Sequence, residues 1–100
     1  MPYINPASRR ELDPKIDDLV DQLFRTSGEN PVPKGNVNYV VTRIALQALE
    51  PRGGWTYTSL SDAVAALQDA ADEIKRRLLG PYEDTCIERN GDLEEFSLDK

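Results

Sequence analysis

Histidine is absent from this 100-residue sequence, and cysteine occurs once, as Cys86. These absences exclude an intrachain disulfide, a zinc site made of thiolates or imidazoles, and every Ser-His or Cys-His nucleophile pair. The sequence also lacks a glycine-rich phosphate loop, since Arg52-Gly53-Gly54 is too short to cradle a phosphate group. We therefore expect a protein that is not an enzyme and that uses neither a cofactor nor a metal.

Long hydrophobic runs are missing as well. No segment approaches the roughly 20 apolar residues that a membrane span requires, and the first residues lack the basic and apolar regions of a secretion signal. A single cysteine fits a reducing compartment. We therefore expect a cytoplasmic protein that makes no membrane contact.

Negative charge is concentrated at one end of the chain. The formal net charge is −6 at pH 7, and most of it lies in residues 83–100. The acidic residues there are Glu83, Asp84, Glu88, Asp92, Glu94, Glu95 and Asp99, against the basic residues Arg89 and Lys100. Phosphate backbones and anionic lipids repel such a surface, so we expect a basic or neutral partner and no direct binding to nucleic acid.

Apolar residues recur at steps of three and four in three segments, which predicts three principal amphipathic helices. The first is expected from Ser8 or Pro14 to Arg25, the second from its N-cap Asn36 to Glu50, and the third from its N-cap Ser59 to Leu78. The Gly80-Pro81 pair predicts the end of the third helix and the start of a short last helix that runs to Arg89. Residues 55–58 alternate large and small side chains, which predicts a short extended segment.

The sequence as a whole predicts a mainly α fold, a compact bundle of three principal helices plus a short C-terminal helix, with a minor extended segment at the termini as an option. Residues 1–92 are expected to form a single helical domain. Residues 93–100 are expected to form an acidic C-terminal tail.

The third helix carries an a/d heptad pattern, the pattern by which helices pair along their length. We call its apolar stripe the heptad seam, which consists of Leu60, Val64, Leu67, Ala71, Ile74 and Leu78. Because so small a domain has little else to cover this seam, we expect a homo-oligomer. Further interface residues are expected on the second side of the second helix, at Leu46 and Leu49, and at the aromatic residues Trp55 and Tyr57.

Four short motifs are distributed over nearly the whole chain. They are Met1-Pro2-Tyr3-Ile4, Asn38-Tyr39-Val40-Val41-Thr42-Arg43, Pro81-Tyr82-Glu83-Asp84 and Asn90-Gly91-Asp92. With these motifs the chain resembles a family of short uncharacterised proteins of bacteria, archaea and tailed phages, a domain of unknown function. The resemblance implies a compact helical fold and a phage or mobile-element setting, and it supplies no catalytic residues. This sequence departs from the family in its alanine-rich third helix and its acidic extension past Asp92.

Arginines and tyrosines supply the candidate ligand-binding residues. One set, on the second helix, consists of Asn38, Tyr39, Thr42 and Arg43, and the other consists of Arg76, Arg77 and Tyr82 with Glu83 and Asp84. Such residues can stack on a nucleobase and hydrogen-bond a phosphate. The structural alternative is that Asn38 and Thr42 bond backbone groups of adjoining loops, while the arginines form ion pairs with Glu83 or Asp84.

The acidic residues 83–92 also raise a hard-metal hypothesis, because oxygen ligands suit magnesium and calcium. Their spacing does not match a calcium-binding loop, since Gly91 lies directly between Asn90 and Asp92. We expect these acids to favour a helix N-terminus instead.

These observations favour a small phage-type accessory protein that binds and blocks a host factor, in the host cytoplasm and in a counter-defence role, through an acidic or interface surface. The alternative is an oligomeric sponge that sequesters a small nucleotide signal at a subunit interface. A metal-dependent hydrolase that uses Glu83 and Asp84 is the third hypothesis.

Overall fold

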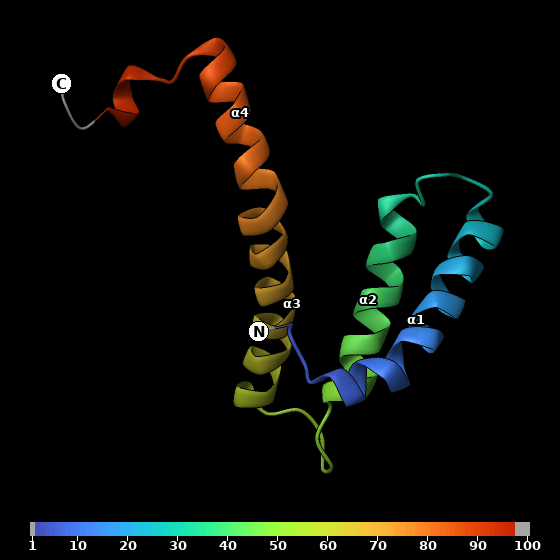
Figure 1. The fold of residues 1–100 in the computed structure, drawn as a ribbon. Coiled ribbons are helices and arrows are strands. Elements are labelled where there is room, and N and C mark those ends of the chain that lie inside the picture. The colour runs from blue at the N-terminus through green and yellow to red at the C-terminus, as the bar shows by residue number, and fades with distance from the viewer. Residues whose placement is uncertain (1, 98–100) are drawn as a thin grey trace.

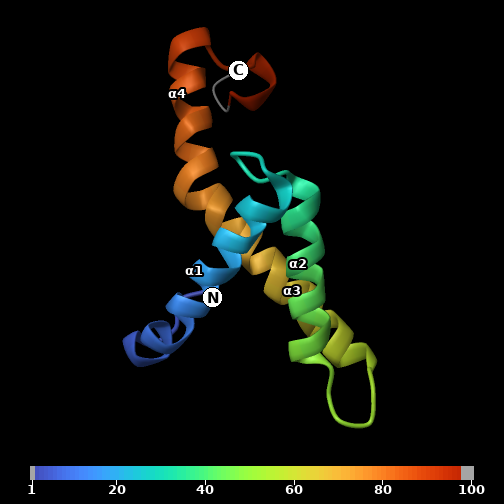
Figure 2. The ribbon, with the colours of Figure 1, turned by 90° about the vertical axis from the view of Figure 1, so that its right-hand side faces the viewer.

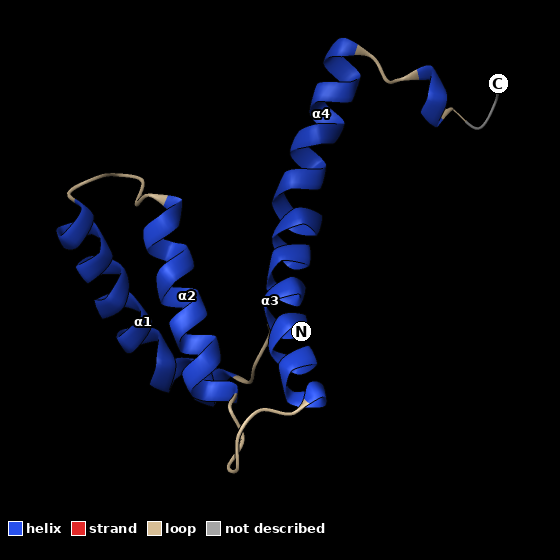
Figure 3. Cartoon of the chain, turned by 180° about the vertical axis from the view of Figure 1, so that it is seen from behind, coloured by secondary structure: helices blue, strands red, loops and turns tan. Residues whose placement is uncertain are grey.

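The computed structural model describes residues 2–97, which form helices and connecting loops and, within that range, no strand (Figures 1 and 3). The elements in chain order are α1 (Pro6–Ser27), α2 (Lys34–Leu49), α3 (Tyr57–Ile74), the π-helical η1 (Lys75–Leu79), α4 (Gly80–Asn90) and the 3-10 helix η2 (Glu94–Phe96). The mainly α class, with three principal helices and a C-terminal helix, is therefore confirmed.

The helices form a hairpin and a rod. Helices α1 and α2 are antiparallel neighbours, and α3, η1 and α4 join end to end into one long, bent helix, which we call the rod (Figures 1 and 2). Among the described elements α2 contacts both α1 and α3, and α4 contacts only η1. The radius of gyration is 18.4 Å, larger than the roughly 13 Å of a compact domain of this length.

Helix α1 begins earlier than either expected start. The side-chain oxygen of Asn5 accepts a hydrogen bond from the Ser8 N–H at 2.9 Å, and Pro6 occupies the first turn. Pro14 therefore lies inside the helix, so the prediction that it starts the helix is wrong. The C-terminus is at Gly28, whose φ of 66° provides the left-handed conformation that ends many helices.

Helices α2 and α3 also begin before their expected caps. Helix α2 follows Pro33 and includes Asn36, which accordingly is not its N-cap. Helix α3 follows Thr56, whose hydroxyl accepts a hydrogen bond from the Ser59 N–H while the Ser59 hydroxyl accepts one from the Thr56 N–H. The expected cap Ser59 is thus the third residue of a capping box, and the extended segment expected at 55–58 is wrong from Tyr57 onward.

The third helix does not stop at Gly80-Pro81, contrary to the prediction. Gly80 has helical angles, and its N–H bonds the carbonyl of Lys75 five residues back, which widens this turn into the π-helical η1. Pro81 has no N–H to donate, and its ring needs space near the preceding turn, so a wide turn before it lets the helix continue. A Cβ at Gly80 would lie 3.1 Å from the Lys75 carbonyl oxygen, which explains why glycine suits this position.

The described parts of the two termini contain no strand. Pro2 lies beside Ala66 and Ala70 of α3, where it lines a small hollow, and the Arg9 side chain donates to the Ile4 carbonyl at 2.9 Å. Residues Glu94–Phe96 of the expected tail form η2. Met1 of the first motif, and Leu98, Asp99 and Lys100 of the tail, lie outside the described residues.

Candidate binding surfaces

The chain exposes far more surface than a compact protein of its size. Its solvent-accessible surface is 8797 Å², whereas a compact 11.2 kDa monomer is expected to expose about 5,700 Å². The excess is about 3,100 Å² per chain. Among residues 2–97 only Ala45 and Ala63 are buried, so most of the apolar side chains that the sequence pattern assigns to a core are exposed.

The heptad seam is one of these exposed surfaces. Most of its side chains remain open to solvent, with Val64, Ile74 and Leu78 at 57%, 61% and 69% exposure. Leu67 is better covered at 39%, because it borders the contact between α3 and α2. Ala71 is exposed as well. Within one chain the seam therefore has no helix packed along it.

The alanine side of α3, which flanks the seam, is the side that α2 covers. Ala63 of α3 and Ala45 of α2 are the buried residues of this contact, and small side chains let two helices approach closely. Beside them an apolar hollow of about 280 Å³ remains, lined by Val41, Ile44, Ala45, Ala48, Leu49, Ala66 and Leu67. Helix α2 is thus covered on two sides, by α1 and by α3, but only in part.

The other expected interface residues lie at separate places. Leu46 and Leu49 are exposed on α2, Trp55 is half-buried in the loop before α3, and Tyr57 is 87% exposed at the start of that helix. Leu49 lines the apolar hollow together with Leu67 of the heptad seam, whereas Trp55 and Tyr57 lie just before and at the start of α3. Among them Tyr57 is the most available to another molecule.

A second apolar hollow, of about 420 Å³, lies between α1 and α2 and was not predicted. It is lined by Leu19, Gln22, Leu23, Thr26, Gly35, Asn36, Tyr39 and Val40. The signal in the sequence was the pair of facing stripes, with Leu19 and Leu23 one turn apart on α1 and Tyr39 beside Val40 on α2. The sequence pattern does not predict the hollow, because the conformation of the loop between α1 and α2 sets the distance between the two stripes.

The candidate ligand-binding residues of α2 are engaged with one another. The Thr42 hydroxyl donates to the Asn38 carbonyl at 2.7 Å, a bond within the helix that replaces the expected contact with a neighbouring loop. The Arg43 guanidinium donates to the Tyr39 hydroxyl at 3.3 Å, and its central carbon lies 6.0 Å from the ring centroid. Arg43 and Tyr39 therefore form a local cation–π pair on the surface of α2.

The second candidate set lies on the rod, away from the first. Arg76 donates two hydrogen bonds to one carboxylate oxygen of Glu73, at 3.0 and 2.6 Å. Within the described residues neither Arg43 nor Arg76 pairs with Glu83 or Asp84, so the expected ion pairs are not formed. Arg77 and Tyr82 lie near the π turn, and α2 makes no contact with α4 among the described elements. One chain therefore does not bring the two sets together, and a nucleotide site that used both would require a second subunit.

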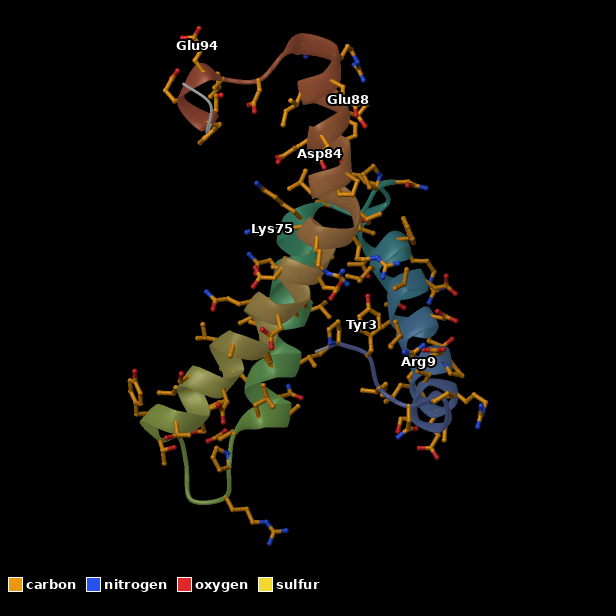
Figure 4. The ribbon with its side chains drawn as sticks, turned by 60° about the vertical axis from the view of Figure 1, so that its left-hand side comes forward. Tyr3, Arg9, Lys75, Asp84, Glu88 and Glu94 are labelled. Carbon is orange, nitrogen blue, oxygen red and sulfur yellow. The ribbon has the colours of Figure 1, made fainter. Side chains whose placement is uncertain are left out.

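The C-terminal part of the rod projects beyond the α1–α2 hairpin (Figures 1 and 2). We call residues 83–96 the acidic arm. Figure 4 shows Asp84 and Glu88 on α4 and Glu94 on η2, with their side chains pointing outward. All the acidic residues of the arm are exposed, and so are its apolar residues Ile87, Leu93 and Phe96. The arm combines negative charge with accessible apolar side chains.

The described residues contain neither a metal-binding cluster nor a membrane-spanning helix. Within residues 2–97 no group of three or more His, Cys, Asp and Glu side chains is placed to hold a metal ion. Over the same range no helix combines the length and the apolarity needed to cross a bilayer.

The fold and these surfaces define a class: a helical hairpin-and-rod protein whose most prominent features are exposed apolar and acidic surfaces. The chain belongs to the family described as a domain of unknown function, DUF6899, whose model matches residues 1–93. No curated protein and no solved structure matches the chain. The expected membership of a family of unknown function is confirmed, while its range over bacteria, archaea and phages stays a prediction.

Proposed function

We propose that this protein is a non-enzymatic binding protein whose acidic arm docks on a basic surface of another protein. The observation that supports this proposal best is the composition of the exposed arm. It carries the acidic residues Glu83, Asp84, Glu88, Asp92, Glu94 and Glu95 and a single basic residue, Arg89. Because α4 contacts only η1, the arm is accessible along its length.

The apolar side chains of the arm support a protein partner over a free cation or a small ligand. Phe96 is 72% exposed and Leu93 58%, and both stand beside acidic residues. Aromatic and aliphatic anchors supply much of the affinity of protein interfaces, while the surrounding charges steer the approach and select the partner. An arm with both features fits a basic protein surface that has apolar pockets.

A basic surface with apolar pockets is typical of proteins that bind nucleic acid. Covering that surface would block the partner. We infer that the chain is a phage-type accessory protein that blocks a host factor in counter-defence. The charge of the arm supports the blocking role, and the motif resemblance supports the phage setting.

The test is a charge reversal on the arm with a matched control elsewhere. The variant E94K/E95K and the control D17K/D18K, on the exposed surface of α1, change the net charge by the same amount. Tagged full-length protein captures the partner from host extract, and the affinity of the purified partner is then measured by calorimetry at two ionic strengths. The arm variant is expected to bind at least about tenfold more weakly and to lose part of the salt dependence.

Two results would contradict the proposal. An arm variant that binds as tightly as the wild type would show that the arm does not contact the partner. Equal weakening by the arm variant and the α1 control would show that only the net charge matters.

A further inference from the structure

The π turn changes which residues of α4 continue the heptad seam. In an uninterrupted α-helix the steps of three and four that link Leu60 to Leu78 would lead next to Pro81, Thr85 and Glu88. None of these residues is suited to an apolar seam. The wide turn η1 contains one extra residue, so every later side chain is shifted by one position around the rod.

With this shift the seam continues through Tyr82 and Cys86. Tyr82 takes the place of Pro81, and Cys86 takes the place of Thr85, so the stripe stays apolar from Leu60 over the π turn to Cys86. Arg89 takes the place of Glu88, and the apolar stripe ends before it. The π turn that accommodates Pro81 thus also keeps the apolar stripe straight. A seam of constant phase over both helices is what a long partner helix requires.

The residues that flank the seam permit two copies of this chain to approach despite their negative charge. In α3 the flanking positions are Ser61, Gln68 and Ala70, which are exposed, and Ala63, which α2 covers, and all four are uncharged. The acidic residues Asp62 and Asp69 fall on the opposite side of the helix by heptad position. Pairing along the seam therefore does not bring like charges together there.

Farther along the rod the flanking residues are charged, and their charges are complementary when the two helices run parallel. After the one-residue shift, Arg77 and Glu83 occupy the flanking positions that meet between the two helices of a parallel pair. Each Arg77 would then lie beside Glu83 of the partner subunit. This complementarity favours a parallel over an antiparallel arrangement.

The surface area also favours a second copy as the occupant. The excess of about 3,100 Å² per chain exceeds the roughly 1,000–2,500 Å² that each subunit of an obligate dimer buries, half of the total of about 2,000–5,000 Å². A transient partner with a standard interface covers only about 800 Å² on each side. A permanent partner is needed, and the chain itself has a seam of matching length and period.

We propose that two copies of this chain pair in parallel along the seam from Leu60 through Tyr82 to Cys86, with Cys86 opposite Cys86 of the partner subunit. The residues of the acidic arm after Cys86 stay free to bind another protein. The inference therefore goes beyond the proposed function and does not depend on it.

The native cysteine provides the first test. Equivalent core positions of a parallel pair face each other across the axis, near the Cα separation of about 4.4–6.8 Å that a disulfide needs. Sedimentation of the reduced full chain is expected to show a dimer. Mild oxidation with copper phenanthroline, which accepts the two electrons released as two thiols form one disulfide, is expected to cross-link most of it. The C86S variant should stay dimeric without cross-linking.

The phase of the seam is tested with two neighbouring residues. C86D is expected to weaken the dimer by on the order of a hundredfold, whereas T85D is expected to change its dissociation constant by less than about threefold, because only residue 86 lies in the seam after the π turn. Circular dichroism at high protein concentration confirms that both variants stay helical. The arm variant E94K/E95K should remain a dimer, so failure of the pairing and failure of the proposed function are separable.

A wild-type monomer at micromolar concentration would overturn the proposal. A dimer that does not cross-link at Cys86 would overturn the parallel arrangement. A stronger effect of T85D than of C86D would overturn the one-residue shift of the seam.

Discussion

Replacement of Thr56 by alanine is expected to destabilise the first turn of α3 and with it the start of the rod. The Thr56 hydroxyl oxygen accepts from the Ser59 N–H at 3.2 Å, and the two hydroxyls lie 3.1 Å apart. Alanine removes this acceptor and leaves the Ser59 N–H without its capping partner. Loss of an N-cap threonine typically costs about 1 kcal/mol, within a range of about 0.5–2. Because Thr56 is exposed and water can reach the turn, we expect about 1 kcal/mol.

The assay is thermal and urea unfolding followed by far-UV circular dichroism, at one fixed protein concentration because self-association would shift the midpoint. A loss of about 1 kcal/mol lowers Tm by roughly 4–8 °C in a domain of this size. T56S, which keeps the hydroxyl, is the matched control and should lie close to the wild type. The reasoning is refuted if T56A unfolds at the wild-type midpoint, or if T56S is destabilised as much as T56A.

Three further predictions concern the hairpin and the rod. G28A should lower the free energy of unfolding by about 1 kcal/mol, because φ at Gly28 is 66° and no atom lies near enough to add a clash, and urea titration measures this loss. E73A removes the ion pair between the half-buried Glu73 carboxylate and the exposed Arg76 and should lower that free energy by no more than about 1 kcal/mol, a difference checked at low and high salt. A saturating panel of cyclic nucleotides should leave Tm unchanged, since Tyr39 and Arg43 contact each other and not the rod, whereas a rise in Tm would favour the nucleotide sponge.

Apolar periodicity explains which features of the fold could be predicted, and helix capping explains where the predicted helix starts differ from the structure. The helix class and the number of principal helices follow from apolar periodicity, which is a property of each segment alone. Several sequences can cap a helix, however, and the side chain that does so depends on backbone angles. The sequence predicts helix starts at Ser8 or Pro14 and at Ser59, whereas the structure caps these helices a few residues earlier, at Asn5 and Thr56.

The continuity of the rod was out of reach for a different reason. Gly80 and Pro81 are each common helix breakers, so their succession predicts a stop. In the structure a change in hydrogen-bond step from four to five residues removes the conflict between Pro81 and the preceding turn. This change alters the face on which Tyr82 and Cys86 lie. A pattern read with a constant step of 3.6 residues per turn cannot include it.

The grouping of the candidate site residues was less predictable than the helices, because it depends on contacts between helices. Composition located the acidic end of the chain, because charge adds up along the sequence without reference to the fold. The grouping of Tyr39 and Arg43 with Arg76, Arg77 and Tyr82 required contacts between α2 and the C-terminal half of the rod, and the described elements make none.

An apolar stripe shows that a face needs to be covered, but it does not show by what. The heptad seam has the same sequence whether α2, a second copy or another protein packs on it, so periodicity alone cannot choose among them. The structure narrows the choice, because α2 takes the alanine side at Ala63 and leaves Val64 and Leu78 open. The uncharged flanks of α3 and the one-residue shift at η1 then favour a partner helix whose apolar residues have the same spacing and whose residues facing those flanks are uncharged. These two properties, more than the apolar stripe itself, are what distinguish a second copy from other occupants.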